Sequence, residues 1–287
     1  MTIQWFPGHM AKAKREVEEK LKVVDFVIEL VDARAPLASQ NPMLQHTLQN
    51  KDKLIVLMKK DLADEAVTEQ WLEQLTNDQH NAITVDVNQK QDIQHVIQAA
   101  KTLANKSLEK WKRKGLRPRP ARAMIIGIPN VGKSTFINRL AHKKIASTGD
   151  RPGITKKQAW IKVKKEFELL DTPGILWPKF EEEIVGYRLA AIGTIKDQLL
   201  PTEDVAAFIL QYMKDHYPNQ LSERYQLNDP SIDVDSLFQH IGTKRGCLEA
   251  GGNVNEEKVA DIILQDLRTG KLGSISLEQP DYQIEEE

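Results

Sequence analysis

Paired cysteines and membrane-length apolar stretches are both missing from this 287-residue sequence. Its single cysteine, Cys247, excludes an internal disulfide and fits a reducing compartment. The first residues contain no basic region followed by an apolar run, and no stretch approaches the length that crosses a bilayer. We therefore expect a cytoplasmic, soluble protein without a membrane partner.

Acidic residues are scarce in one long stretch. Residues 101–165 hold nineteen Lys or Arg but only two acids, Glu109 and Asp150, which gives this stretch a charge of +17. The net charge of the whole chain is only −1, so the remaining sequence is acidic. Such a basic belt indicates a polyanionic partner larger than a nucleotide. A solvated surface would explain the same composition.

Apolar and amphipathic segments alternate through the first part of the chain. This alternation of strands and helices predicts an α/β fold with a doubly wound, mostly parallel sheet. Strands are expected at residues 23–31, 54–58, 82–87, 123–126, 159–163 and 167–170. Helices are expected at residues 11–22, 42–49, 68–75 and 92–104, and a basic connector at residues 110–122.

The strand pattern stops near residue 178. Only helices are expected beyond it, near residues 182–196, 203–217, 235–241 and 256–267. Because the chain exceeds the usual size of a single domain, we expect two. Residues 1–178 would form the domain with the sheet, and residues 179–287 would form an all-helical domain.

The strongest motif is GIPNVGKS at residues 127–134, which matches the phosphate-binding pattern GxxxxGKS. It lies between a short apolar strand and a helix, which is the context that the motif requires. Its glycines let the backbone N–H groups surround a triphosphate, and the helix adds the positive end of its dipole. Lys133 is expected to reach the outer phosphates and Ser134 to bind Mg²⁺. The nucleotide-binding residues predicted here are Asn130, Val131, Gly132, Lys133, Ser134 and Thr135.

A second nucleotide motif, DxxG, begins at Asp171 after a predicted strand. Its carboxylate can hold Mg²⁺ through water, and the N–H of Gly174 can contact the γ-phosphate. Thr155 lies in the loop between the two motifs and is the candidate that closes over Mg²⁺ and the γ-phosphate. An ordinary loop threonine is the other interpretation of Thr155.

The base-reading residues are expected at Lys59, Lys60 and Asp61, directly after a buried strand. Asp61 would accept both N–H donors of a guanine base, and the stem of Lys59 would pack over the ring. These residues precede the phosphate loop in the chain. A sheet is closed by neighbours in space, so the same site can form with the termini placed elsewhere. The order of motifs therefore predicts a circular permutation.

The motifs follow the order MKKD, GIPNVGKS, PGIT and DTPG, with WFPGHMAKA at the start and an Asp32-Ala33-Arg34 turn. This combination resembles the circularly permuted GTPases of ribosome assembly, in particular the ribosome biogenesis GTPase A (RbgA/YlqF) family. The resemblance covers essentially the whole chain. It implies GTP hydrolysis coupled to late maturation of the bacterial large ribosomal subunit, whose rRNA would contact the helical domain and the basic surfaces. It also implies that K⁺ is a second cofactor, held by Asn130.

Three positions depart from the usual GTPase pattern. Ile175 follows DxxG where many GTPases carry a glutamine that orients the attacking water, and the resemblance offers His9 for that role. Met58 replaces the Asn of the base motif, which would weaken purine discrimination. Asn88 follows a strand at the place of the loop that backs the base, although the expected Ser is missing. The expected catalytic set is His9, Lys133, Thr155 and Gly174.

Three hypotheses follow from these motifs. The leading one is a monomeric, Mg²⁺-dependent GTPase that binds GTP and GDP and is stimulated by the ribosome. Ile175 favours a second, a nucleotide-gated RNA-binding module in which hydrolysis is incidental. Met58 alone favours a third, an ATP-using phosphotransferase.

Overall fold

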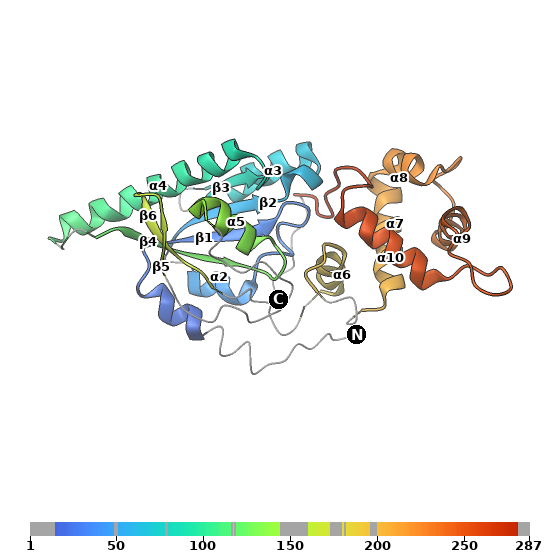
Figure 1. Cartoon of the computed structure of the whole chain (residues 1–287), viewed down its shortest axis with the longest axis horizontal. Helices are drawn as coiled ribbons and strands as arrows, with labels where there is room; N and C mark the ends of the chain where they lie inside the picture. The colour runs from blue at the N-terminus through green and yellow to red at the C-terminus, as the bar shows by residue number, and fades with distance from the viewer. Residues whose placement is uncertain are drawn as a thin grey trace.

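The computed structural model describes residues 15–48, 51–77, 80–115, 117, 119–143, 160–172, 180, 182–195 and 200–280. These residues form a six-stranded sheet with helices on both faces, and further helices gather beyond the carboxyl ends of the strands (Figure 1). The strands are β1 (Phe26–Asp32), β2 (Asp52–Met58), β3 (His80–Val85), β4 (Ala121–Gly127), β5 (Trp160–Val163) and β6 (Phe167–Leu170).

Helices follow or precede almost every strand in the described part of the chain. A helical stretch at residues 15–21 leads into β1. The helices around the sheet are α2 (Pro42–Leu48), the short 3-10 helix η1 (Lys60–Leu62), α3 (Glu65–Leu75), α4 (Lys90–Arg113) and α5 (Lys133–Ala141). The C-terminal helices are α6 (Glu183–Ala191), α7 (Thr202–His216), α8 (Pro218–Tyr225), α9 (Val234–Arg245) and α10 (Glu256–Arg268).

The spatial order of the strands is β3-β2-β1-β4-β6-β5. Every neighbouring pair is parallel except β5 with β6, which is antiparallel at the edge. The chain runs outward from β1 in one direction and from β4 in the other, so the topological switch point lies between these two strands, where such folds bind ligands. The strand that leads into the phosphate loop is therefore fourth in the chain but central in the sheet. The predicted doubly wound sheet with permuted motifs is confirmed.

The sheet is buried on both faces, and β1 shows how. Phe26, Ile28 and Leu30 pack into the core cluster that includes α4 and α5. Val27 and Val31 point to the opposite face, where residues 15–21, α2 and α3 cover the sheet. All seven residues of β1 are buried. Such continuous burial is typical of a parallel strand with helices on both sides.

Helix α4 is longer than the sequence predicted. We expected a helix over residues 92–104 and a connector from residue 110, but the helix continues to Arg113. The extra turns are held because Lys106 and Lys110 both pair with Asp52, at 2.7 and 3.1 Å, and because Ser107 is buried. Lysine and arginine also favour helix intrinsically. The last turns of α4 extend past the sheet (Figure 1).

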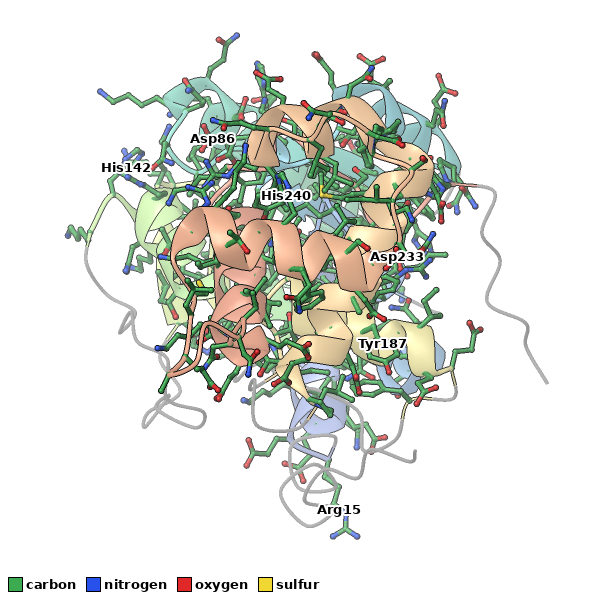
Figure 2. The ribbon with its side chains drawn as sticks, turned by 90° about the vertical axis from the view of Figure 1, so that its right-hand side faces the viewer. Arg15, Asp86, His142, Tyr187, Asp233 and His240 are labelled. Atoms are coloured by element: carbon green, nitrogen blue, oxygen red, sulfur yellow. The ribbon has the colours of Figure 1, made fainter. Side chains whose placement is uncertain are left out.

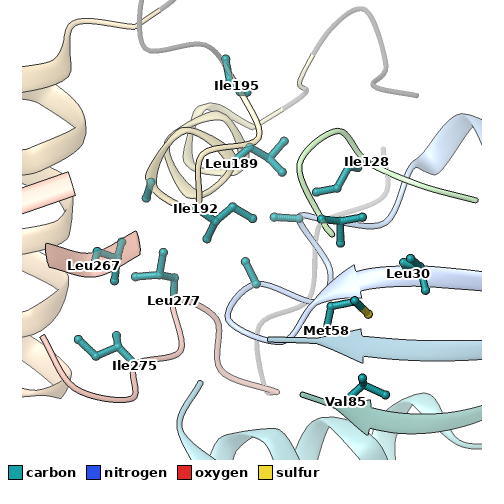
Figure 3. Packing of buried hydrophobic residues seen from close by; sticks show 14 of the residues in the cluster. Leu30, Met58, Val85, Ile128, Leu189, Ile192, Ile195, Leu267, Ile275 and Leu277 are labelled. Atoms are coloured by element: carbon teal, nitrogen blue, oxygen red, sulfur yellow. The ribbon is translucent and has the colours of Figure 1, made fainter. Parts of the chain in front are cut away.

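The C-terminal helices share one apolar cluster with the carboxyl edge of the sheet. Figure 3 shows Ile128 next to Leu189 and Ile192 of the α6 segment, with Leu277 between these and α10. Figure 2 looks onto the C-terminal helices, where His240 of α9 lies 3.0 Å from the carbonyl oxygen of Tyr225 in α8. Helix α8 was absent from the sequence prediction. None of the helices that the structure describes could span a membrane.

Candidate nucleotide site

The structure explains why both glycine positions of the phosphate-loop pattern, Gly127 and Gly132, are occupied by a residue without a side chain. Gly132 has a φ of 101°, which disfavours any side chain, and its carbonyl oxygen accepts the first hydrogen bond of helix α5, from the N–H of Phe136 at 2.9 Å. A Cβ on Gly127 would lie 3.0 Å from the carbonyl oxygen of Leu30 in the neighbouring strand. Asn130 has a φ of 59°, a left-handed conformation that asparagine tolerates. The loop therefore forms a tight turn between β4 and the N-terminus of α5, which is the geometry that anion-binding loops have.

The side chain of Asn130 contacts the C-terminal helices. Its Nδ2 donates to the carbonyl oxygen of Gly193, at 2.9 Å. Gly193 follows α6, and Arg268 of α10 holds the same turn by donating to Ala190 and Ala191 at 2.8 and 3.2 Å. Because a carbonyl oxygen can only accept, the amide is oriented with Nδ2 toward Gly193 and with Oδ1 away from it.

Lys133 and Asp171 meet where phosphates and Mg²⁺ are expected. The Lys133 Nζ lies 2.6 Å from the Asp171 Oδ1, and both side chains are nearly buried. Next to Asp171, the hydroxyl of Thr172 donates to the carbonyl oxygen of Ile125 at 2.7 Å and ties this segment to β4. Bound phosphates would compete with Asp171 for the lysine, because each group offers it anionic oxygens.

Met58 links the base motif to the phosphate loop through apolar contact. Its side chain is 1% exposed, and its methyl group lies 3.4 Å from the position that a Cβ on Gly132 would take. Figure 3 shows Met58 between Leu30 and Val85 at the ends of neighbouring strands. The methionine thus packs beneath the phosphate loop in this chain.

Replacing Met58 by Asn, the residue usual in this motif, is expected to destabilise the nucleotide-free protein. The change buries an amide in an apolar cluster and removes packing, which costs about 2–4 kcal/mol of unfolding free energy. Met58→Leu keeps the apolar volume and should cost less than about 1.5 kcal/mol. Urea denaturation of both variants measures the difference. Equal stability of the two variants would show that Met58 does not support the loop by packing.

Lys59 of the base motif is held by the carboxyl end of β1. The Lys59 Nζ lies 2.9 Å from the Asp32 Oδ2, and Arg34 donates to both oxygens of that carboxylate at 2.9 Å. Burial alone would raise the pKa of Asp32, but the Arg34 guanidinium and the Lys59 ammonium outweigh it and hold this pKa well below its usual range. The Asp32-Ala33-Arg34 turn therefore closes on itself and also positions Lys59.

A second pair of bonds joins the loop after β3 to the base motif. Lys60 pairs with Asp92 at 2.8 Å, and the same Asp92 oxygen accepts from the N–H of Asp86 at 2.8 Å. The Asp86 side chain in turn accepts from the N–H of Asn88 at 2.8 Å. The Asn88 Oδ1 accepts from Arg139 of α5 at 3.5 Å. Asn88 is thus placed between the base motif and α5.

The described residues of the predicted site all follow the carboxyl ends of parallel strands or lie in the first turn of α5. Asp61 is exposed on η1, and the carboxyl ends of β1 and β2 are aligned by the pairing of Asp32 with Met58. His9, Thr155 and Gly174 lie outside the described residues. The link through Asp92 was not predicted, because its only signal in the sequence is an acid in the first turn of a helix.

This fold and this edge define a class of protein. A phosphate loop with its lysine and serine, an aspartate after a neighbouring strand, and a Lys-x-Asp element on a third strand together define a P-loop GTPase. The strand before the Lys-x-Asp element, β2, precedes the phosphate-loop strand, β4, in the chain, so the GTPase is circularly permuted.

Comparisons with known proteins agree with this class. A family described as 50S ribosome-binding GTPase matches residues 122–233. The ribosome biogenesis GTPase A of Bacillus cereus is 53% identical over 98% of this chain and 95% of its own length. The mitochondrial ribosome-associated GTPase 1 of Xenopus tropicalis is 33% identical over 96% of this chain and 94% of its own length.

Solved structures show the same architecture. GNP-bound YlqF from T. maritima superimposes with a TM-score of 0.64 at 26% identity, covering 94% of this chain and 99% of that one. A GDP-bound YlqF structure gives a TM-score of 0.65 at 25% identity, covering 93% and 100%. The chain belongs to the ribosome biogenesis GTPase A family.

Proposed function

We propose that this GTPase acts in ribosome biogenesis by hydrolysing GTP during late maturation of the bacterial large ribosomal subunit, as a monomer in the cytoplasm. The observation that carries this proposal is the convergence of the phosphate loop and Lys59-Lys60-Asp61 at one edge of the sheet. The relatives named as ribosome biogenesis GTPases match over nearly the full chain, which supports the biological role.

Within this proposal each residue has a role. Lys133 contacts the outer phosphates, Asp61 accepts from the guanine base, and Lys59, Lys60 and Asn88 frame the base. Gly174 contacts the γ-phosphate, and Thr155 closes over it. His9 orients the attacking water, because the aliphatic Ile175 cannot hydrogen-bond it.

The residues present fit Mg²⁺. Ser134 supplies a hydroxyl oxygen in the first turn of α5, and Asp171 supplies a carboxylate at the end of β6. Mg²⁺ prefers such oxygen ligands and is usually held by one or two protein groups together with substrate phosphates. When bound, Mg²⁺ neutralises charge on the phosphates. Ser134, Thr155 and Asp171 form the proposed Mg²⁺ site.

We propose that the exposed C-terminal end of α4 binds ribosomal RNA. Several cations of the basic belt are paired with carboxylates, among them Arg119 with Asp25 at 2.8 Å and Arg122 with Glu168 at 3.3 Å. The exposed cations at the overhanging end of α4 are Lys112, Arg113, Lys114 and Arg117. RNA phosphates attract such clusters. The helical domain, residues 179–287, is the second proposed RNA-binding part, beside the GTPase domain of residues 1–178.

The proposed K⁺ site predicts a cation-dependent rate. Asn130 Oδ1 is available for K⁺ while its Nδ2 bonds Gly193, so GTP turnover should be at least about tenfold faster in K⁺ than in Na⁺. Asn130→Ala should remove this difference and keep GDP affinity within about threefold. Phosphate release at matched ionic strength measures both proteins. Equal rates of the unmodified protein in the two salts would contradict the K⁺ assignment.

A further inference from the structure

The last described segment of the chain returns to the base-reading loops. We call residues 275–278 the C-terminal strap. The N–H of Ile275 donates to the carbonyl oxygen of Leu62 at 3.0 Å, and the Ser276 hydroxyl accepts from the N–H of Asp64 at 3.2 Å. These two bonds hold the chain directly after Asp61.

The same strap holds the loop that positions Lys59. The N–H of Leu277 donates to the carbonyl oxygen of Arg34 at 2.6 Å. The carboxylate of Glu278 accepts from the N–H groups of Leu37 and Ala38, at 2.7 and 2.9 Å. Arg34 holds the Asp32 carboxylate, which in turn pairs with the Lys59 ammonium, so the strap contacts the supports of both base-reading side chains.

On its other side the strap is fixed to the C-terminal helices. The Tyr217 hydroxyl bonds the N–H and the carbonyl oxygen of Ser276, at 3.2 and 3.3 Å. Arg188 of α6 lies 3.4 Å from the Glu278 carboxylate, and both side chains are almost fully buried. Burial raises the pKa of Glu278 to about 7, although Arg188 and the two amides favour its charged form. Measurements above pH 8 therefore examine the carboxylate.

We propose that the C-terminal strap is a specificity-positioning element of the nucleotide site, with Glu278 as its anchor. It fixes Asp61 and Lys59 relative to each other by binding the loops that carry and support them. The proposal rests on the proposed guanine-reading role of Asp61. It assigns the strap no contact with the nucleotide, so its effect reaches the base through Leu62 and Arg34.

The test compares GDP with inosine diphosphate, whose base lacks the exocyclic amino group that Asp61 would bind. We expect the unmodified protein to prefer GDP by about tenfold or more, since one hydrogen bond to a charged acceptor is lost. Glu278→Gln replaces one acceptor by a donor that faces a backbone N–H. It should lower the GDP to inosine diphosphate affinity ratio at least threefold, with a smaller loss for inosine diphosphate, which offers Asp61 only one of the two N–H donors. Isothermal titration calorimetry at pH 8.5 measures both ligands.

Two further variants keep the test decisive. Ser276→Ala removes only the acceptor for Asp64 and should lower the ratio about twofold, even if Glu278→Gln fails to fold. Asp266→Asn is the matched control, because this buried carboxylate bonds Arg224 of α8 at 2.8 and 2.9 Å. It should reduce thermal stability while the ratio stays at its original value.

The possible outcomes distinguish the proposed role of the strap from the proposed base-reading role of Asp61. A lower GDP to inosine diphosphate affinity ratio in the strap variants, with the ratio of Asp266→Asn unchanged, supports the proposal. An unchanged ratio, or an equal loss of affinity for both ligands, would show that the strap only stabilises the fold. If the unmodified protein prefers neither GDP over inosine diphosphate nor GDP over ADP, the base-reading role of Asp61 fails first, and the proposal fails with it.

Discussion

GTP turnover by a Lys133→Met variant is expected to fall at least about 100-fold, because the lysine is the cation that the phosphate loop presents to the outer phosphates. The structure places its ammonium 2.6 Å from Asp171, in the cradle between β4, β6 and α5. Methionine keeps the length and apolar stem of the side chain but removes the charge. Single-turnover phosphate release with saturating GTP measures the loss of rate separately from weaker binding.

Lys101→Met is the matched control for this variant. Lys101 pairs with Glu166 at 3.1 Å on the surface of α4, is not part of the predicted nucleotide site, and has a side chain that is 39% exposed. Its removal should leave turnover within about twofold, as expected for an exposed ion pair. A Lys133→Met rate as high as that of the control would contradict the assigned role of Lys133.

The same lysine variant has a stability consequence without nucleotide. Lys133→Met leaves the nearly buried Asp171 without its cation, which should lower the unfolding free energy by about 1–3 kcal/mol. Adding Asp171→Asn should recover part of that loss, because the unpaired charge is then gone. Urea denaturation of the single and double variants gives the coupling between the two side chains.

Replacing Asp61 by Asn should change the base that this protein binds. The aspartate is exposed in the middle of η1, where its carboxylate can accept from two N–H groups of guanine. An amide can accept from only one of them, so GDP affinity should fall about 100-fold. Its NH₂ group can donate to the additional carbonyl of xanthine, so affinity for xanthosine diphosphate should rise.

Competition of GDP, xanthosine diphosphate and ADP against one fluorescent nucleotide measures this exchange of preference. The unmodified protein should rank GDP first, and Asp61→Asn should rank xanthosine diphosphate first. The thermal stability of Asp61→Asn should stay close to that of the unmodified protein, since an exposed carboxylate is replaced by an isosteric amide. A variant that still ranks GDP first would place base reading elsewhere, and a preference for ADP in both would favour the phosphotransferase hypothesis.

Local patterns could predict those parts of the site that depend on neighbouring residues. Gly127 and Gly132 predict a tight strand-to-helix turn. In the structure Gly127 lies close to the neighbouring strand, and Gly132 has a positive φ. The permutation was also predictable, because Lys59 and Asp61 follow an uninterrupted apolar run that can only be a buried strand. Adjacent positions in the sequence carry this information.

Features that join distant segments left no comparable signal. Nothing in the sequence around Glu278 shows that its carboxylate bonds the loop after β1, some 240 positions earlier. The end of α4 was missed because the basic residues from Lys110 onward were assigned to a connector, whereas Asp52 at the start of β2 pairs with both Lys106 and Lys110 on the helix. Such contacts arise from tertiary packing, which overrides local propensity.

GTP turnover in K⁺ buffer, measured with and without purified large ribosomal subunits, tests the proposed function. We expect slow turnover of the isolated protein, since Ile175 cannot orient the attacking water, and a rise of at least about tenfold when subunits are added. His9→Ala should bind the subunits but lose most of this rise. Turnover that stays the same with subunits present would contradict the central claim that this protein is a GTPase switched by the large subunit.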